Sequence, residues 1–486
     1  MILFKKKAVR CMNNKQAHLQ KNGDGGRGAG VCAVLSMGGC FALGNFTDNF
    51  YKQCAVLLAA SAGLTSMQSY ATVLFSLPFI LFSAWAGWLA DKVPKKHIVV
   101  GAKAVECVAL LLGAWALLHG LWAGMLAVLF FMGLQATFFS PALNGAIPEL
   151  FEAPAVPRVN SLIKLASTVA VLAGIAGAGF FLDFRYVLAP EQAAGLHVVH
   201  MPDAVLAWMP ALQGAGGQLA FGRGMAGLFI ILVAVVGVLV AFTMRQPPRQ
   251  QHTQQHPFPW AGPVDSFRHF WALRGDSALF LVLCAEAFFY GIAAIAVISV
   301  SNLSAALGYS DTFSSMLSSA LMVGIAVGAL FAGRTPAESW QRLLAPASLG
   351  MGLCLWAVAA TPLAPTLLPW VPMAQAGWFF VWLFLCGVCG GVYLIPLASF
   401  IQVRPAPSEK GRVIGVSNFL SFVFIACCGV LFYVVAAGLG AVAAALFAQE
   451  TARVAASAGV FLVYGGVLAG LATVVWRRVH AKGWSL

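Results

Sequence analysis

The sequence predicts an all-α integral membrane protein with twelve transmembrane helices. Hydrophobic residues make up 60% of the 486 residues and charged residues only 9%, whereas a soluble globular chain carries roughly 25% charged residues. Apolar runs recur along the chain, and each approaches or exceeds the roughly 20 helical residues that cross a bilayer. Most charges lie between these runs, so we assign the net charge of +13 to membrane-surface loops and expect no nucleic-acid partner.

The apolar runs give twelve predicted spans, whose boundaries can shift by a few residues. They cover 34–60, 69–90, 97–119, 122–144, 159–182, 222–244, 277–300, 312–333, 343–361, 375–400, 412–437 and 456–476. Residues 1–30 are basic and lack the apolar core and cleavage site of a signal peptide, which predicts a disordered cytoplasmic tail. A short second tail is predicted at 477–486.

Lysine and arginine residues mark one side of the predicted bundle. Every second connection is basic, whereas the opposite set holds only Arg185, Arg223 and Arg453. Cytoplasmic loops of membrane proteins carry an excess of Lys and Arg. Both termini are therefore predicted to face the cytoplasm.

A long connection divides the chain into two parts. Residues 245–276, with their Gln, His and Pro content, predict a cytoplasmic linker between an N-terminal half, 31–244, and a C-terminal half, 277–476. An internal repeat supports this division, since sparse matches fall at the same place in each set of six spans. Gly133, Pro141 and Arg158 match Gly387, Pro396 and Arg412 at a nearly constant separation.

The outer connection 183–221 is unusually long and contains His197 and His200. Two nearby histidines fit either metal ligands or solvated loop side chains, and we favour the second interpretation. The eleven cysteines are scattered within apolar segments, as expected for small buried side chains. We therefore expect no metal site and no disulfide framework.

A polar face runs through the first predicted span. Asn45, Asp48, Asn49 and Lys52 recur at helical spacing and therefore share one side of the helix. A charge at the bilayer centre costs roughly 3 kcal/mol on insertion scales, so this face is expected to point toward other helices or water. Alternatively, Asp48 and Lys52 pair with each other at i, i+4 and only lower the cost of insertion.

A cytoplasmic motif follows the second span. Gly87-Trp88-Leu89-Ala90-Asp91-Lys92-Val93-Pro94-Lys95-Lys96 matches G-x-L-A-D-[RK]-x-x-[RK]-[RK], and the chain thereby resembles the major facilitator superfamily of transporters. The resemblance implies two six-helix halves and a loop that latches them in the outward-facing state. Glycine permits close helix approach, and an acid at a helix end can pair with arginines and helix N-termini. The gate residues so implied are Gly87, Asp91, Lys92, Lys95, Lys96, Glu149, Arg158 and Arg412.

Three further strings resemble the lysophospholipid transporter branch of this superfamily. They are Asn45-Phe46-Thr47-Asp48-Asn49-Phe50-Tyr51-Lys52, then Met132-Gly133-Leu134-Gln135-Ala136-Thr137-Phe138-Phe139-Ser140-Pro141 leading to Ile147-Pro148-Glu149-Leu150, and Val159-Asn160-Ser161-Leu162. Thr47 replaces an asparagine of the branch pattern, and Ser161 replaces a glycine. The resemblance is specific over about residues 40–180 and weak beyond them.

The resemblance implies that spans 1, 4, 7 and 10 line a central cavity. Polar residues on these spans are candidates for substrate binding or ion coupling: Asn45, Asp48, Asn49, Lys52, Gln135, Asn144, Glu286, Tyr290 and Tyr393. In a dry cavity Lys52 could meet a phosphodiester, and Asp48 or Glu286 an ammonium group. The acids could instead carry a coupling proton or sodium ion. Glu286 has no local partner, which favours a functional role, whereas Lys103 and Glu106 at i, i+3 predict a structural pair.

The resemblance implies a secondary transporter that moves lysophospholipids across the bacterial inner membrane by alternating access. A major facilitator efflux pump for amphipathic drugs or other small molecules is the alternative. An acyltransferase is disfavoured because the chain has no H-x-x-x-x-D string, and ATP hydrolysis because it has no P-loop. We expect no enzyme activity and no cofactor. The expected protein is a monomer, with the substrate, a coupling ion and a separate acyltransferase as candidate partners.

Overall fold

The computed structural model describes residues 33–151, 156–188, 197–202, 213, 217–246, 258, 260–332, 341–363, 375–405 and 410–482. The first helix covers 33–61. The other helices are α2 (Thr65–Lys92), α3 (Lys95–His119), α4 (Trp122–Leu150), α5 (Val156–Leu182), α7 (Gly217–Thr243), α8 (Pro263–Ala272), α9 (Ser277–Ala306), α10 (Asp311–Ala332), α11 (Gln341–Ala360), α13 (Gln375–Val403), α14 (Lys410–Leu446) and α15 (Gln449–Lys482). Eleven of these, all except α8, are long and apolar enough to cross a membrane. With the first helix, the described residues hold the twelve predicted spans.

Two helices of the C-terminal half extend well beyond their predicted spans. The span predicted at 412–437 is part of α14, which continues to Leu446, and the span predicted at 456–476 lies inside α15, Gln449–Lys482. The added ends are rich in alanine or carry polar residues. Alanine and the long polar residues are good helix formers, but neither raises hydropathy as leucine or valine does. The two helices therefore extend beyond the segments that hydropathy identifies as spans.

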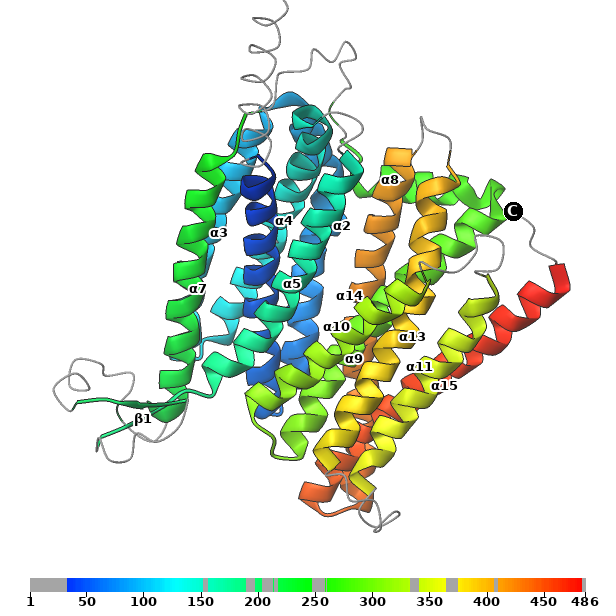
Figure 1. Ribbon diagram of the computed structural model, residues 1–486. Coiled ribbons are helices and arrows are strands. Elements are labelled where there is room, and N and C mark those ends of the chain that lie inside the picture. The colour runs from blue at the N-terminus through cyan, green and yellow to red at the C-terminus, as the bar shows by residue number, and fades with distance from the viewer. Residues whose placement is uncertain are drawn as a thin grey trace, which may run out of the picture.

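The helices form two bundles, which Figure 1 shows side by side with the N-terminal bundle in blue to green. Within the N-terminal half α2 packs on α4, and α3 packs on α4 and α7. Within the C-terminal half α10 packs on α13, α11 on α15, and α9 on α14. The main helix contacts between the halves are α2 with α14 and α5 with α10. Each half has hydrophobic clusters of its own.

Glycines set the close helix contacts at equivalent places in the two halves. A Cβ atom added at Gly133 of α4 would lie 2.3 Å from the carbonyl oxygen of Phe75 in α2, and one at Gly387 of α13 would lie 2.1 Å from that of Leu321 in α10. Only a residue without a side chain allows backbones to approach this closely. The repeat predicted from Gly133 and Gly387 therefore corresponds to a shared packing contact between the second and fourth spans of each half.

Two connections contain structure that the sequence did not predict. The linker ends in α8, and the outer loop contains a parallel pair of short strands, β1 (Arg185–Val187) and β2 (Val198–His200). Gln218 of α7 ties β1 to the bundle, because its side chain accepts from the amide of Tyr186 at 3.1 Å and donates to its carbonyl oxygen at 2.9 Å. Figure 1 places β1 at one end of the bundle and α8 at the opposite end, and we call these the β1 end and the α8 end.

The two loop histidines pack against the protein. The ring of His197 lies 4.6 Å from the ring of Phe180, and His200 Nε2 lies 3.1 Å from the carbonyl oxygen of Leu188. Among the described residues, no group of three or more His, Cys, Asp or Glu side chains is arranged to hold a metal ion.

Candidate functional site

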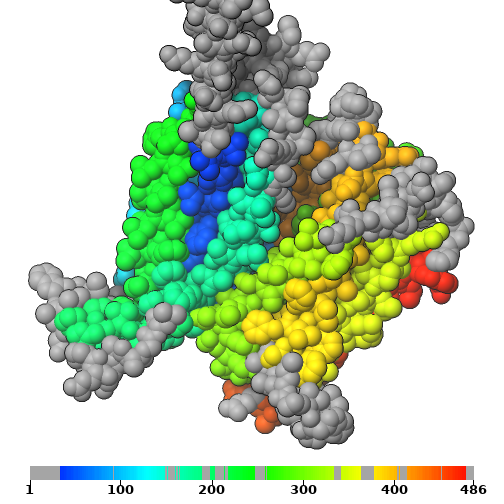
Figure 2. Space-filling view, in the orientation of Figure 1, coloured from blue at the N-terminus to red at the C-terminus, as the bar shows by residue number. Residues whose placement is uncertain are grey.

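The first helix presents aromatic and polar residues on different sides. Phe50 and Tyr51 are fully buried, and the ring of Phe50 lies 5.6 Å from that of Phe229 in α7. Figure 2 shows part of the first helix, in blue, at the surface between α7 and α5. The four residues of the predicted polar face are half-buried. Asn45 and Asn49 donate to the carbonyl oxygens four residues earlier, at 2.9 and 2.8 Å, so local bonds satisfy their amides.

The structure brings the two charged residues of this face to neighbouring helices of the same half. Gln135 Nε2 of α4 lies 3.4 Å from Asp48 Oδ1, and the ammonium of Lys52 lies 5.3 Å from the ring centre of Phe75 in α2. The side-chain oxygen of Gln135 is buried without a hydrogen-bond partner among the described residues. No ion pair within 4.0 Å joins Asp48 to Lys52 among the described side chains. Each charged residue thus lies beside a neutral side chain of a neighbouring helix.

A buried ion pair lies behind this face. Lys103 Nζ and Glu106 Oε2 of α3 are 2.6 Å apart, and each side chain is only 1% exposed. The other carboxylate oxygen of Glu106 accepts from the hydroxyl of Thr47 at 2.5 Å, and Lys103 also lies 5.0 Å from the ring centre of Phe139. The predicted pair thus ties the first helix to α3 and α4. The sequence indicated the pair by its i, i+3 spacing but not the part that Thr47 plays.

Glu286 of α9 has a partner in the distant α14. The hydroxyl of Ser417 donates to Glu286 Oε2, and both residues are 7% exposed. The sequence could not show this contact, because the two residues lie in different spans. Tyr290 follows one helical turn after Glu286 and is 37% exposed. Glu286 is thus a buried acid with a single neutral donor among the described residues.

The structure places the other two candidates apart from these clusters. Asn144 is exposed, and its amide donates to the backbone and hydroxyl oxygens of Ser140 at 2.9 and 3.2 Å. Tyr393 is 1% exposed, and its ring stacks on that of Phe289 at 6.0 Å. Tyr393 also lines an apolar pocket among α9, α11, α13, α14 and α15.

The candidate gate residues lie at the α8 end of the bundle. A Cβ atom added at Gly87 would have no neighbour within 4 Å, so the close helix approach expected there is absent in this structure. Lys92 is exposed with its ammonium 5.8 Å from the ring centre of Trp88, and Lys95 Nζ donates to the carbonyl oxygen of Gly145 at 3.2 Å. Lys96 is half-buried. The side chains of Asp91, Glu149, Arg158 and Arg412 lie outside the described part of the structure.

Contacts at the β1 end join the two halves. Asp183, which follows α5, accepts from the backbone amides of Asp311 and Thr312 at 3.2 and 2.7 Å. It thereby caps the N-terminus of α10, where unpaired amides and the helix dipole favour an anion. Asn302 of α9 donates to Gln68 of α2 at 2.5 Å. These bonds hold the halves together at this end.

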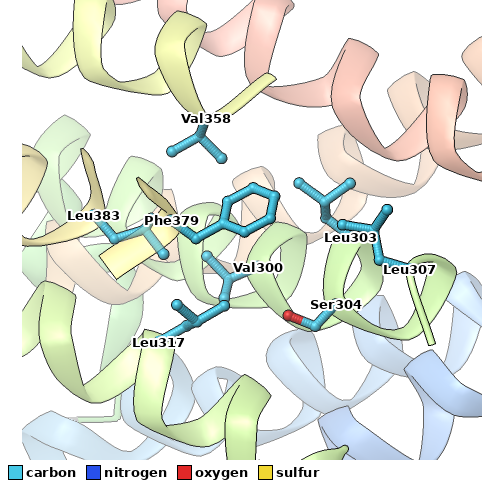
Figure 3. Close-up of a pocket in the computed structure, with 8 residues that line it drawn as sticks. All are labelled: Val300, Leu303, Ser304, Leu307, Leu317, Val358, Phe379 and Leu383. Carbon is cyan, nitrogen blue, oxygen red and sulfur yellow. The ribbon is translucent and has the colours of Figure 1, made fainter. Parts of the chain in front are cut away.

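Three hollows lie among the described residues. One of about 370 Å³ is the apolar pocket beside Tyr393, and one of about 490 Å³ lies at the β1 end beside Asn302 and Arg453. Figure 3 shows the third, in which Val300, Phe379 and Leu383 surround a space of about 10 Å³. That volume holds at most about one water molecule. It is a packing void of the C-terminal core rather than a substrate site.

Comparison with solved structures and protein families agrees with this architecture. The structure of a bacterial homologue of the human lysosomal transporter Spinster, in an inward-facing and unoccupied conformation, aligns with a TM-score of 0.64 at 15% identity. The alignment covers 94% of this chain and 99% of that one. The family model of the Major Facilitator Superfamily matches residues 35–189. The chain is thus similar to this superfamily over residues 35–189 and shares the fold of the solved transporter over almost its whole length.

The chain is also similar in sequence to proteins named "Lysophospholipid transporter LplT". It is 28% identical to that of Photorhabdus laumondii subsp. laumondii over 152 residues, which cover 30% of this chain and 35% of the relative. It is 25% identical to that of Enterobacter sp. over 346 residues, which cover 70% of this chain and 72% of the relative. The transporter therefore spans about a third of the first relative and most of the second.

Proposed function

We propose that this transporter moves lysophospholipids, such as lysophosphatidylethanolamine, across the bacterial inner membrane by alternating access. The observation that carries the proposal is the similarity to transporters named for lysophospholipid, which extends over 70% of this chain in the Enterobacter relative. Of the described connections, Lys92, Lys95 and Arg404 lie at the α8 end, which we assign to the cytoplasm by the excess of Lys and Arg. Both termini are then cytoplasmic, and the β1 end faces outward.

The chemistry of the polar clusters supports this substrate. A lysophosphatidylethanolamine head group combines a phosphodiester anion with an ammonium. Lys52 supplies a cation near Phe75, and Asp48 and Glu286 supply acids that bond neutral side chains rather than lysine. In a site that excludes water, opposite charges attract more strongly than at a protein surface. We assign Lys52 to the phosphate, and Asp48 or Glu286 to the ammonium or to a coupling ion.

The test is uptake of labelled lysophosphatidylethanolamine into spheroplasts that express the transporter. A hydrogen bond to a charged group contributes about 1.5–3 kcal/mol, so Asp48→Asn, Lys52→Met and Glu286→Gln should each lower uptake by roughly tenfold or more. Asp265→Asn, a matched change at a residue 40% exposed outside the spans, should leave uptake unchanged. Expression levels of all variants are compared on the same membranes.

The same strains separate the proposal from drug efflux. Saturable uptake that the three site changes abolish supports the lysophospholipid carrier. No uptake by well-expressed transporter, together with increased resistance to amphipathic drugs, would reject the lipid cargo in favour of the efflux pump.

A further inference from the structure

An unpartnered apolar stripe runs along α8. Val264, Phe267 and Trp271 follow one another at i, i+3 and i+7, so they share one side of the helix, and the exposed Trp260 lies in the turn just before it. Their exposed fractions are 50%, 52%, 49% and 85%. The rings of Phe267 and Trp271 stack at 5.8 Å. Four large exposed apolar side chains within one short segment favour a binding surface over chance exposure.

The other sides of α8 are a protein contact and a polar face. Phe270 is 7% exposed, and its ring stacks on that of Phe280 in α9 at 4.7 Å, which fixes the helix on the bundle. Asp265 and Arg268 form an exposed ion pair at 3.7 Å, and His269 is exposed. Successive residues of a helix turn by 100°, so the apolar stripe lies between the protein contact and the polar face.

The stripe of α8 lies at the same level as the ends of the membrane-spanning helices. Only the turn Leu273–Gly275 and Asp276 separate α8 from the start of α9, and α8 contacts both α2 and α14. Phe258 connects the same segment to the N-terminal half, since its ring lies 5.1 Å from that of Trp88 in α2. Tryptophan at this level is typical of the membrane–water interface.

Cationic side chains flank the stripe. The guanidinium of Arg274 stacks on the ring of Trp271 at 3.3 Å, and Arg268 is 73% exposed. An amphipathic helix with aromatic residues on one side and basic residues on the other lies in the interfacial plane of a bilayer and is attracted to anionic lipids. A lipid surface accounts for both features, because its apolar boundary accepts the stripe and its phosphates attract the arginines. A protein partner would not require basic residues beside the stripe.

We propose that α8 is an interfacial anchor, whose stripe of Val264, Phe267 and Trp271 enters, with the preceding Trp260, the head-group boundary of the leaflet at the α8 end while Arg268 and Arg274 bind anionic lipid head groups. The lipid is here a surface rather than a cargo. The proposal therefore holds whether the transported substrate is a lysophospholipid or a drug.

The test is photo-crosslinking of the full-length transporter in vesicles of phosphatidylcholine with and without phosphatidylglycerol. A benzophenone amino acid is introduced in place of Phe267 and, as a matched control on the polar face, in place of His269. A third protein carries it in place of Leu232, an exposed residue of the α7 span, to calibrate contact with lipid. Lipid adducts should form at position 267 several-fold more than at position 269, and phosphatidylglycerol should raise the yield.

A charge variant tests the anionic preference. A basic residue near an anionic surface changes lipid affinity by about fivefold, so Arg268→Gln should lower the preference for phosphatidylglycerol by about that factor without changing adducts in phosphatidylcholine. Equal yields at positions 267 and 269, or adducts at position 232 with none at 267, would overturn the proposal. Crosslinks from position 267 to a protein instead of lipid in native membranes would overturn it as well.

Discussion

At the scale of single residues, the ion pair of Lys103 and Glu106 is a charged group buried inside a membrane span. Both side chains are 1% exposed and 2.6 Å apart, and Thr47 supplies a further hydrogen bond to the carboxylate. A buried ion pair is a weak source of stability, but removal of one partner leaves an unpaired charge and costs about 3–5 kcal/mol. The pair therefore constrains the packing of the first helix on α3.

Lys103→Met should destabilise the transporter strongly, because Glu106 would lose its cationic partner at a buried position in an apolar span. We expect a loss of about 3–5 kcal/mol, observed as a large fall in the apparent Tm of the purified protein. The double variant Lys103→Met/Glu106→Gln removes both charges and should recover most of the loss. A double variant no more stable than Lys103→Met would contradict the assignment of the cost to an unpaired charge.

Residue identities predicted some of the site contacts and not others. The i, i+3 spacing of Lys103 and Glu106 predicted their pairing, because one helix contains both. The polar face of the first helix was predictable for the same reason. The contact of Glu286 with Ser417 spans α9 and α14, and no local pattern reports which distant helix supplies a donor. The sequence therefore predicts polar faces but not their tertiary partners.

At the scale of elements, the start of α9 shows how a helix end is stabilised outside the membrane. Asp276 is its N-cap and accepts from the backbone amide of Leu279 at 3.2 Å, while Arg404 Nε lies 3.0 Å from its other oxygen. Partial burial alone would raise the pKa of Asp276, but the hydrogen bond from Arg404 and the cap amides outweigh it and hold the pKa below the ordinary value of 3.8. The ionised carboxylate therefore stabilises the helix start.

Asp276→Asn should lower stability by about 0.5–1 kcal/mol at neutral pH, because asparagine keeps an acceptor but loses the charge. A depressed pKa gives stability that is present above pH 3.8 and is lost as the pH falls through the lower folded value. The difference in apparent Tm between the two proteins should therefore disappear in acid. A difference that persists unchanged well below pH 3.8 would contradict this origin.

Hydropathy predicted the long elements and missed the short ones. Each span is long and apolar enough to cross a bilayer, so its existence follows from composition. α8 has ten residues and lies in a linker with mixed polarity, and β1 and β2 have three residues each. Such short segments depend on tertiary contacts, including those from Gln218 to β1 and from Phe270 to α9, which no local periodicity contains.

At the scale of the whole molecule, the two halves contact each other through helices whose sequences give no indication that they meet. The internal repeat predicted two equivalent halves, but nothing in it indicates which ends meet. In the structure Asp183 caps α10 and Gln68 bonds Asn302, both at the β1 end. At the α8 end Gly87 has open space beside it. Which ends of the halves meet is thus a property of the assembled halves rather than of either sequence repeat.

Gly179 of α5 lies where these halves meet and permits a close approach of α5 to α10. A Cβ atom there would lie 2.1 Å from the carbonyl oxygen of Asp311 and 2.5 Å from the hydroxyl of Ser315 in α10. The first of these is backbone, which cannot move aside as a flexible side chain can. Gly179→Ala should therefore act as a wedge that separates the halves at the β1 end.

The wedge can be observed with a cysteine in place of Ser315, which is fully buried beneath α5. In the Ser315→Cys protein a membrane-impermeant maleimide should react slowly from the β1 side, and the addition of Gly179→Ala should raise the rate several-fold while lowering transport. Gly177→Ala is the matched control on α5, because its Cβ would meet ring carbons of Phe50 at 3.4 Å and of Phe46 at 3.8 Å, which are ordinary contacts within the same half. Labelling of the parent protein, which retains Ser315, measures the reaction of the native cysteines, and this background is subtracted. Unchanged labelling with Gly179→Ala would mean that the α5–α10 contact is not what closes the β1 end, and alternating access would then depend on α2 and α14.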